Sequence, residues 1–127
     1  MKKSTREWVK KAEEDYVVAT QGRRSKVPVH DSVCFHCQQS AEKYLKALLQ
    51  ELGGIVPRTH DLELILERLR PEHPKLGSLR RVLLILNPYA VEYRYPGTSA
   101  RKRQAQAALR HAEKVRAVVR RRLDLTD

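Results

Sequence analysis

Apolar residues recur at three- and four-residue steps along nearly the whole 127-residue chain, the spacing that places side chains on one face of an α-helix. Five such stretches follow one another, and each forms a single apolar stripe. No stretch shows the alternation of apolar and polar residues that is typical of a half-buried strand. The stripes are Trp8, Val9, Ala12, Tyr16 and Ala19; Cys34, Cys37, Ala41, Leu45, Leu48 and Leu52; Leu62, Ile65, Leu66 and Leu69; Leu76, Leu79, Val82, Leu83 and Leu86; and Ala105, Ala108, Leu109, Ala112, Val115, Val119 and Leu123.

Glycine, proline and capping residues predict where these helices begin and end. Short connections between long amphipathic helices favour an antiparallel arrangement. We therefore predict one all-α domain over residues 1–127, an up-and-down antiparallel bundle of four main helices plus a shorter one. The boundary signals are Ser4 or Thr5 as the first cap, a first stop near Gly22, a loop from Gln21 to His30, Asp31 or Ser32 as the second cap, Gly53-Gly54 as the second stop, a third helix that starts after Thr59 and ends before Pro71, a fourth that ends before Pro88, and Thr98 or Ser99 as the last cap.

The chain is strongly basic, with 26 Lys and Arg against 15 Asp and Glu and a formal net charge of +11. Most of the excess lies at the two ends, with a net +4 over residues 1–30 and +6 over residues 100–127. Such a field attracts polyanions such as RNA, DNA, a nucleotide or an acidic protein. A solvated helix face would carry the same residues, so charge alone leaves the partner open.

Several classes of protein are disfavoured by composition. The longest uncharged apolar run, over residues 82–87, is far too short to cross a bilayer. Charged residues rather than an apolar segment follow Met1, which argues against a secretory signal. Two cysteines make a disulfide scaffold implausible. We expect a soluble, cytoplasmic protein that does not bind membranes.

Four short motifs resemble the HEPN domain family and occur in the order that such a domain has. They are residues 33–47 (VCFHCQQSAEKYLKA), Thr59-His60-Asp61-Leu62, Tyr93-Arg94-Tyr95-Pro96-Gly97 and the alanine-rich last helix. The resemblance covers roughly Trp8 to Leu123. It implies a helical bundle with a nucleotide-binding role, often a homodimer, and often paired with a minimal nucleotidyltransferase-like protein, as in toxin–antitoxin modules. Other branches of the superfamily are metal-independent ribonucleases with an Arg-x(4–6)-His motif.

One group of candidate residues would bind a nucleotide or an RNA phosphate. Lys43 and Lys46 lie three residues apart and share part of a helix face. Together with Arg94 they would supply positive charge to a phosphate, while Tyr93 and Tyr95 would offer rings for base stacking. In the alternative interpretation Lys46 pairs with a carboxylate one turn away, at residue 42, and the tyrosines close the end of the bundle.

His60 is a further candidate, because it lies at a predicted helix start where backbone N–H groups favour anions. Arg58 and Thr59 would join it in a phosphate site. The alternative, which we favour, is that Thr59 caps the helix and His60 hydrogen-bonds into the bundle.

A metal-independent endoribonuclease would need an arginine to stabilise the phosphorane and a histidine to move a proton. Two pairs match the spacing, Arg68 with His73 and Arg24 with His30. Neither lies near the start of the last helix, where the resemblance places the motif. Seven residues separate Arg103 from His111 there, which is outside the spacing. This departure argues against catalysis and keeps the nuclease as an alternative.

Cys34 and Cys37 fall on one face of the second helix without a second cysteine pair, so we predict buried thiols and neither a metal nor a cofactor. The leading hypothesis is a HEPN-type nucleotide- or RNA-phosphate-binding module that partners a nucleotidyltransferase-like protein. A nuclease is one alternative. A structural partner without a ligand is the other.

Overall fold

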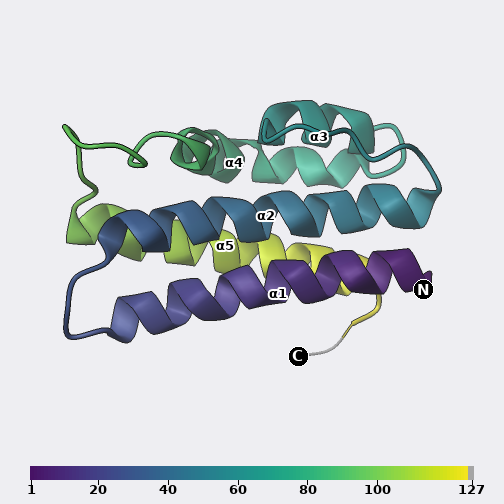
Figure 1. The fold of residues 1–127 in the computed structure, drawn as a ribbon. Coiled ribbons are helices and arrows are strands. Elements are labelled where there is room, and N and C mark those ends of the chain that lie inside the picture. The colour runs from purple at the N-terminus through teal and green to yellow at the C-terminus, as the bar shows by residue number, and fades with distance from the viewer. Residues whose placement is uncertain (126–127) are drawn as a thin grey trace.

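The computed structural model describes residues 1–125, and within them all regular structure is helical, which confirms the all-α prediction. Three of the α-helices are long and two are short. They are stacked side by side (Figure 1). No helix in the described part of the chain is long and apolar enough to span a bilayer. The elements are α1 (Lys3–Arg24), α2 (His30–Leu52), α3 (Leu62–Leu69), the 3₁₀-helix η1 (Pro74–Leu79), α4 (Arg80–Leu86), the 3₁₀-helix η2 (Asn87–Ala90) and α5 (Lys102–Arg122).

Helix α2 is the centre of the fold. It packs against α1 and α5 on one side and against α3 and α4 on the other (Figure 1). The fourth predicted stripe is divided, because Gly77 disfavours a regular α-helix and residues 74–79 form a 3₁₀-helix before α4. The bundle therefore has three long helices. Short segments, α3, η1, α4 and η2, stand in place of a fourth long helix.

Several helix boundaries differ from the sequence signals for local reasons. Helix α1 continues through Gly22 to Arg24, and a Cβ at Gly22 would lie 2.7 Å from Val33 Cγ2, so this glycine serves the close approach of α1 and α2. Asp61 rather than Thr59 caps α3, since its Oδ1 accepts a hydrogen bond from the Glu63 backbone N–H at 3.0 Å.

Other boundaries follow the sequence. Gly53 ends α2 in the left-handed conformation, at φ 86°, as the predicted stop. Helix α3 ends at Leu69 and α4 at Leu86, before their prolines. The start of the last helix, by contrast, differs from the prediction: it begins at Lys102 with Arg101 rather than Thr98 or Ser99 as the cap, and the Gln104 side-chain oxygen accepts from the Arg101 N–H at 2.8 Å.

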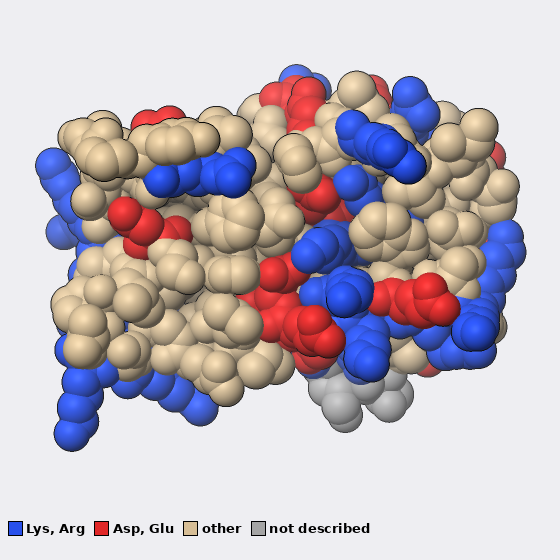
Figure 2. All heavy atoms as spheres, viewed as in Figure 1, with Lys and Arg blue, Asp and Glu red and all other residues tan. Residues whose placement is uncertain are grey.

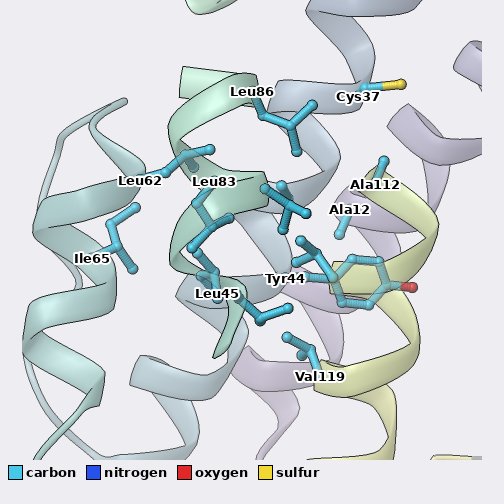
Figure 3. Close-up of a cluster of buried hydrophobic side chains, with 14 of the residues drawn as sticks. Ala12, Cys37, Tyr44, Leu45, Leu62, Ile65, Leu83, Leu86, Ala112 and Val119 are labelled. Carbon is cyan, nitrogen blue, oxygen red and sulfur yellow. The ribbon is translucent and has the colours of Figure 1, made fainter. Parts of the chain in front are cut away.

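The core is one apolar cluster around α2 (Figure 3). Tyr44 points toward Ala12 and Val119, while Leu45 lies on the side of α3 and α4. These residues are fully buried, and burying a leucine-sized side chain contributes about 1.5–3 kcal/mol. The apolar stripes read from the sequence are therefore the surfaces that hold the bundle together.

A polar contact ties the three long helices together at the edge of this core. The Tyr44 hydroxyl donates to Glu13, and Glu13 also accepts from Arg116 Nη2 at 2.8 Å. Burial, followed by the hydrogen bond to Glu13, raises the pKa of Tyr44 to about 12. Arg116 also lies 4.9 Å from the centroid of the Tyr16 ring.

Candidate functional site

A cavity of about 280 Å³ opens at the end of the bundle, where α2 begins and the segment after η2 crosses toward α5. We call it the aromatic pocket. Three aromatic rings and one arginine line it together with two small polar residues of the first turn of α2. Its lining residues are Asp31, Ser32, Phe35, Tyr89, Tyr93 and Arg94.

The rings and the arginine of this pocket are arranged against one another. Arg94 Cζ lies 5.9 Å from the centroid of the Phe35 ring, within the range of a cation–π contact. Tyr89 and Tyr93 have centroids 5.8 Å apart at an angle of 30°. Burial raises the pKa of Tyr89 to about 12, so this phenol stays neutral and available as a hydrogen-bond donor at physiological pH.

Two side-chain hydrogen bonds hold the segment that carries Tyr93 and Arg94. Asp31 Oδ1, on α2, accepts from the Ala100 backbone N–H at 2.6 Å. Gln104 Nε2, on α5, donates to the Tyr93 hydroxyl at 3.0 Å. The pocket is thus positioned by α2 and α5, and part of the Asp31 carboxylate is already used for this purpose.

A second, more polar hollow of about 660 Å³ adjoins the aromatic pocket, and Tyr93 lines both. We call it the basic recess. Three consecutive exposed cations at the start of α5 face it, where the helix dipole also favours anions. The recess is lined by Glu92, Tyr93, Thr98, Ser99, Arg101, Lys102, Arg103 and Gln104.

Together, the two hollows place aromatic rings and a guanidinium beside a group of cations and hydroxyls. Aromatic faces and a guanidinium plane stack on a base, and adjacent cations with hydroxyls bind phosphate. The HEPN domain family model matches residues 5–122 of the chain. The chain belongs to the HEPN domain family. No curated protein matched the sequence.

Two solved structures share this HEPN fold. The protein TT1696 from Thermus thermophilus superposes with a TM-score of 0.81 at 25% identity, covering 92% of this chain and 96% of that one. ST0689, described as an archaeal HEPN homologue, gives a TM-score of 0.73 at 25% identity, with 96% and 98% covered. Both comparisons agree with the all-α architecture over almost the full length.

The structure brings together only part of the predicted phosphate group of this HEPN domain. Tyr93 and Arg94 line the aromatic pocket, whereas Tyr95 is 74% exposed and outside its lining. Lys43 Nζ pairs with Asp15 at 2.6 Å. Lys46 Nζ pairs with Glu42 at 2.9 Å. The i,i+4 pairing considered for Lys46 is therefore the observed arrangement, and carboxylates already neutralise both lysines.

His60 lies in the connection between α2 and α3 and is held to α2. Its Nδ1 is 2.9 Å from Glu42 Oε1, and its carbonyl oxygen accepts from Gln38 Nε2 at 3.0 Å. The ring is otherwise 70% exposed. The favoured alternative, that His60 hydrogen-bonds into the bundle, agrees with this geometry, and Thr59 Oγ1 accepts from the Asp61 N–H at 3.1 Å.

Acidic and basic atoms adjoin one another across the middle of the face that α1 and α2 present (Figure 2). There Asp15 accepts from both His36 and Lys43, at 2.8 and 2.6 Å. Burial alone would raise the pKa of Asp15, but hydrogen bonds from His36 and Lys43 and their charges lower it below its ordinary value. This face is a network of matched charges.

Neither arginine–histidine pair considered for a nuclease is joined by a hydrogen bond within residues 1–125. Arg68 is exposed on α3, while His73 Nδ1 lies 3.5 Å from Arg122 Nη1. Burial and the Arg122 charge lower the pKa of His73. Arg24 ends α1 and His30 begins α2, and His30 Nδ1 is buried without a hydrogen-bond partner.

Cys34 and Cys37 are fully buried, as expected for core thiols. Burial raises the pKa of Cys34 to about 11 and raises that of Cys37 further above the ordinary thiol value. No group of three His, Cys, Asp or Glu side chains in the described range is arranged to hold a metal ion.

Sequence reasoning missed Phe35, Tyr89 and the cations of the basic recess. Phe35 carried a usable signal, because it stands well off the apolar stripe of α2 that Cys34 and Ala41 mark. An aromatic residue outside the buried face of an amphipathic helix needs another explanation, and here it is the pocket wall.

Proposed function

We propose that this HEPN domain is a binding module that takes a nucleotide, or the terminal nucleotide of an RNA, into the aromatic pocket with its phosphates in the basic recess. The observation that carries the proposal is the position of Arg94, whose Cζ lies 5.9 Å from the centroid of the Phe35 ring in a pocket that adjoins three consecutive cations. The adenine or other base contacts the aromatic rings and the guanidinium in the aromatic pocket.

Isothermal titration calorimetry with ATP at about 150 mM salt tests this proposal. Arg94→Ala removes the cation of the pocket, and Arg81→Ala, which changes another exposed arginine on α4 outside both hollows, is the matched control. Saturable binding that is retained by Arg81→Ala and lost by Arg94→Ala supports the site. Unchanged binding by Arg94→Ala contradicts it.

We also propose that the module works as a homodimer and as the partner of a nucleotidyltransferase-like protein, in a pair of the toxin–antitoxin kind. Membership in the HEPN family supports the pairing. An apolar groove of about 710 Å³ along α1, bordered by Val9, Val17 and Val18, supports the dimer. Two antiparallel copies of α1 related by an axis near residue 12 would place Lys10 of one copy opposite Glu14 of the other.

Sedimentation equilibrium tests the dimer, which should have twice the 14.7 kDa mass of the chain. Val17→Glu, a change in the apolar lining of the groove, should give a monomer that remains fully helical by circular dichroism. Two results would count against this interface: a monomeric wild type, or a Val17→Glu variant that still dimerises as tightly as the wild type.

A further inference from the structure

Helix α5 carries a row of cations on the side that faces away from the bundle. At 100° per residue, Arg103, Arg110, Lys114 and Arg121 fall within about 40° of one another. All four are exposed, and within residues 1–125 none of them forms an ion pair with a carboxylate. We call this row the α5 stripe.

The α5 stripe differs from an ordinary solvated helix face in that it carries a single sign of charge. The solvent side of α1 mixes Glu7 and Glu14 with lysines and arginines. On α5 the one acidic residue, Glu113, stands about 80° from the stripe and accepts a hydrogen bond from the Tyr16 hydroxyl at 3.2 Å. Like charges four residues apart, such as Arg110 and Lys114, oppose helix formation. Such an arrangement is stabilised by a bound polyanion.

The stripe connects two hollows at opposite ends of α5, which runs the length of the bundle (Figure 1). Arg103 also lines the basic recess. Arg121 lines a pocket of about 290 Å³ at the other end, together with Lys75, Ser78 and Arg122. With a rise of 1.5 Å per residue, the two ends of the stripe are about 27 Å apart.

We propose that the α5 stripe binds the backbone of a single-stranded nucleic acid whose terminal base occupies the aromatic pocket. This inference rests on the proposed function, because it makes the pocket the end of a longer site. Helix α5 has no Phe, Tyr or Trp, so the stripe contacts phosphates without stacking bases, and stacking is confined to the pocket. A length of about 27 Å suits a strand at the lower end of the roughly 4–16 nucleotides that single-strand-binding folds cover.

An acidic protein helix is a less suitable ligand for the α5 stripe than a nucleic acid. An acidic amphipathic helix would need an apolar seam beside the ion pairs, as coiled coils have. The positions between the cations are Ala107 and Ala117, which offer little apolar area. Continuity with the aromatic pocket through the basic recess, where Tyr93 lines both hollows, favours nucleic acid.

Fluorescence anisotropy of a labelled eight-nucleotide oligouridylate, titrated over a range of salt concentrations, tests the inference. Each phosphate contact on a single strand contributes about −0.7 to the slope of log K against log salt, so four contacts contribute about −2.8. Changing all four stripe cations to glutamine should remove about 2.8 from the slope and weaken binding roughly 200-fold at 0.15 M salt. The matched control changes Lys3, Lys11, Lys26 and Arg81 to glutamine, an equal loss of charge at exposed positions elsewhere.

The expected result is a reduced slope in the stripe variant and a nearly normal slope in the control variant. Equal behaviour of the two variants would overturn the inference, because net charge alone would then account for binding. Equally tight binding of an eight-residue polyglutamate, lost in the same variant, would overturn it in favour of an acidic protein partner. ATP titration tests the proposed function separately: Arg94→Ala should lose ATP binding, whereas a variant that changes only Arg110, Lys114 and Arg121 to glutamine, which line neither the aromatic pocket nor the basic recess, should bind ATP normally.

Discussion

The pair formed by Glu42 and Lys46 is the polar contact whose disruption should cost the most stability. The two side chains are only 4% and 7% exposed, and Glu42 Oε2 lies 2.9 Å from Lys46 Nζ. Glu42→Leu would leave the ammonium group buried, 5.6 Å from the Trp8 ring centroid, without its carboxylate. Removing one partner of a buried pair costs about 3–5 kcal/mol, and for a domain of this size about 3 kcal/mol lowers Tm by roughly 10 °C.

Urea unfolding followed by far-ultraviolet circular dichroism measures this effect, with two further variants as references. Glu42→Leu combined with Lys46→Met replaces the pair by apolar groups and should recover most of the loss. Glu67→Leu breaks an exposed pair with Arg70, whose side chains are 57% and 45% exposed, and should change stability by less than about 1 kcal/mol. A Glu42→Leu variant as stable as Glu67→Leu, or a double variant no more stable than Glu42→Leu, would refute the reasoning.

Two further predictions follow from the titrating groups of the core. Because hydrogen bonds from His36 and Lys43 hold the pKa of Asp15 below its ordinary value of 3.8, Asp15 stabilises the fold above that pH, and the stabilisation disappears as pH falls through the lower folded-state pKa. Asp15→Asn should therefore be less stable than the wild type at pH 7, and the difference should shrink below about pH 4; a constant difference from pH 7 to pH 2 would contradict this. Cys34 and Cys37, buried and with raised pKa values, should not react with a thiol reagent at pH 8 until urea unfolds the chain, and rapid labelling of the native protein would show that they are accessible.

The helices could be predicted from the sequence because each buries one apolar stripe, and such a stripe is a local pattern. Gly53 could be identified as a helix stop because helices often end in the left-handed conformation, here at φ 86°, which glycine adopts without strain. Gly22 does not mark the end of α1. A glycine is needed there because Val33, on α2, lies too close to leave room for a side chain. Close approach of two helices depends on tertiary structure and leaves no signal in the neighbouring residues.

The candidate site was predicted less completely, for a similar reason. Tyr93 and Arg94 lie within one motif and could be singled out together. Phe35 and Tyr89 reach the same pocket from distant segments, which only the folded chain brings together. The Lys43 ammonium group pairs with Asp15, which lies 28 residues away in the sequence, and no spacing rule indicates this pair.

Calorimetric titration of ATP into the wild type, Arg94→Ala and Arg81→Ala proteins at about 150 mM salt tests the central claim most directly. The structure predicts saturable binding by the wild type and by Arg81→Ala, and none by Arg94→Ala, with all three proteins equally helical. Binding that survives in Arg94→Ala, or the absence of binding in every protein, would contradict a nucleotide site in the aromatic pocket.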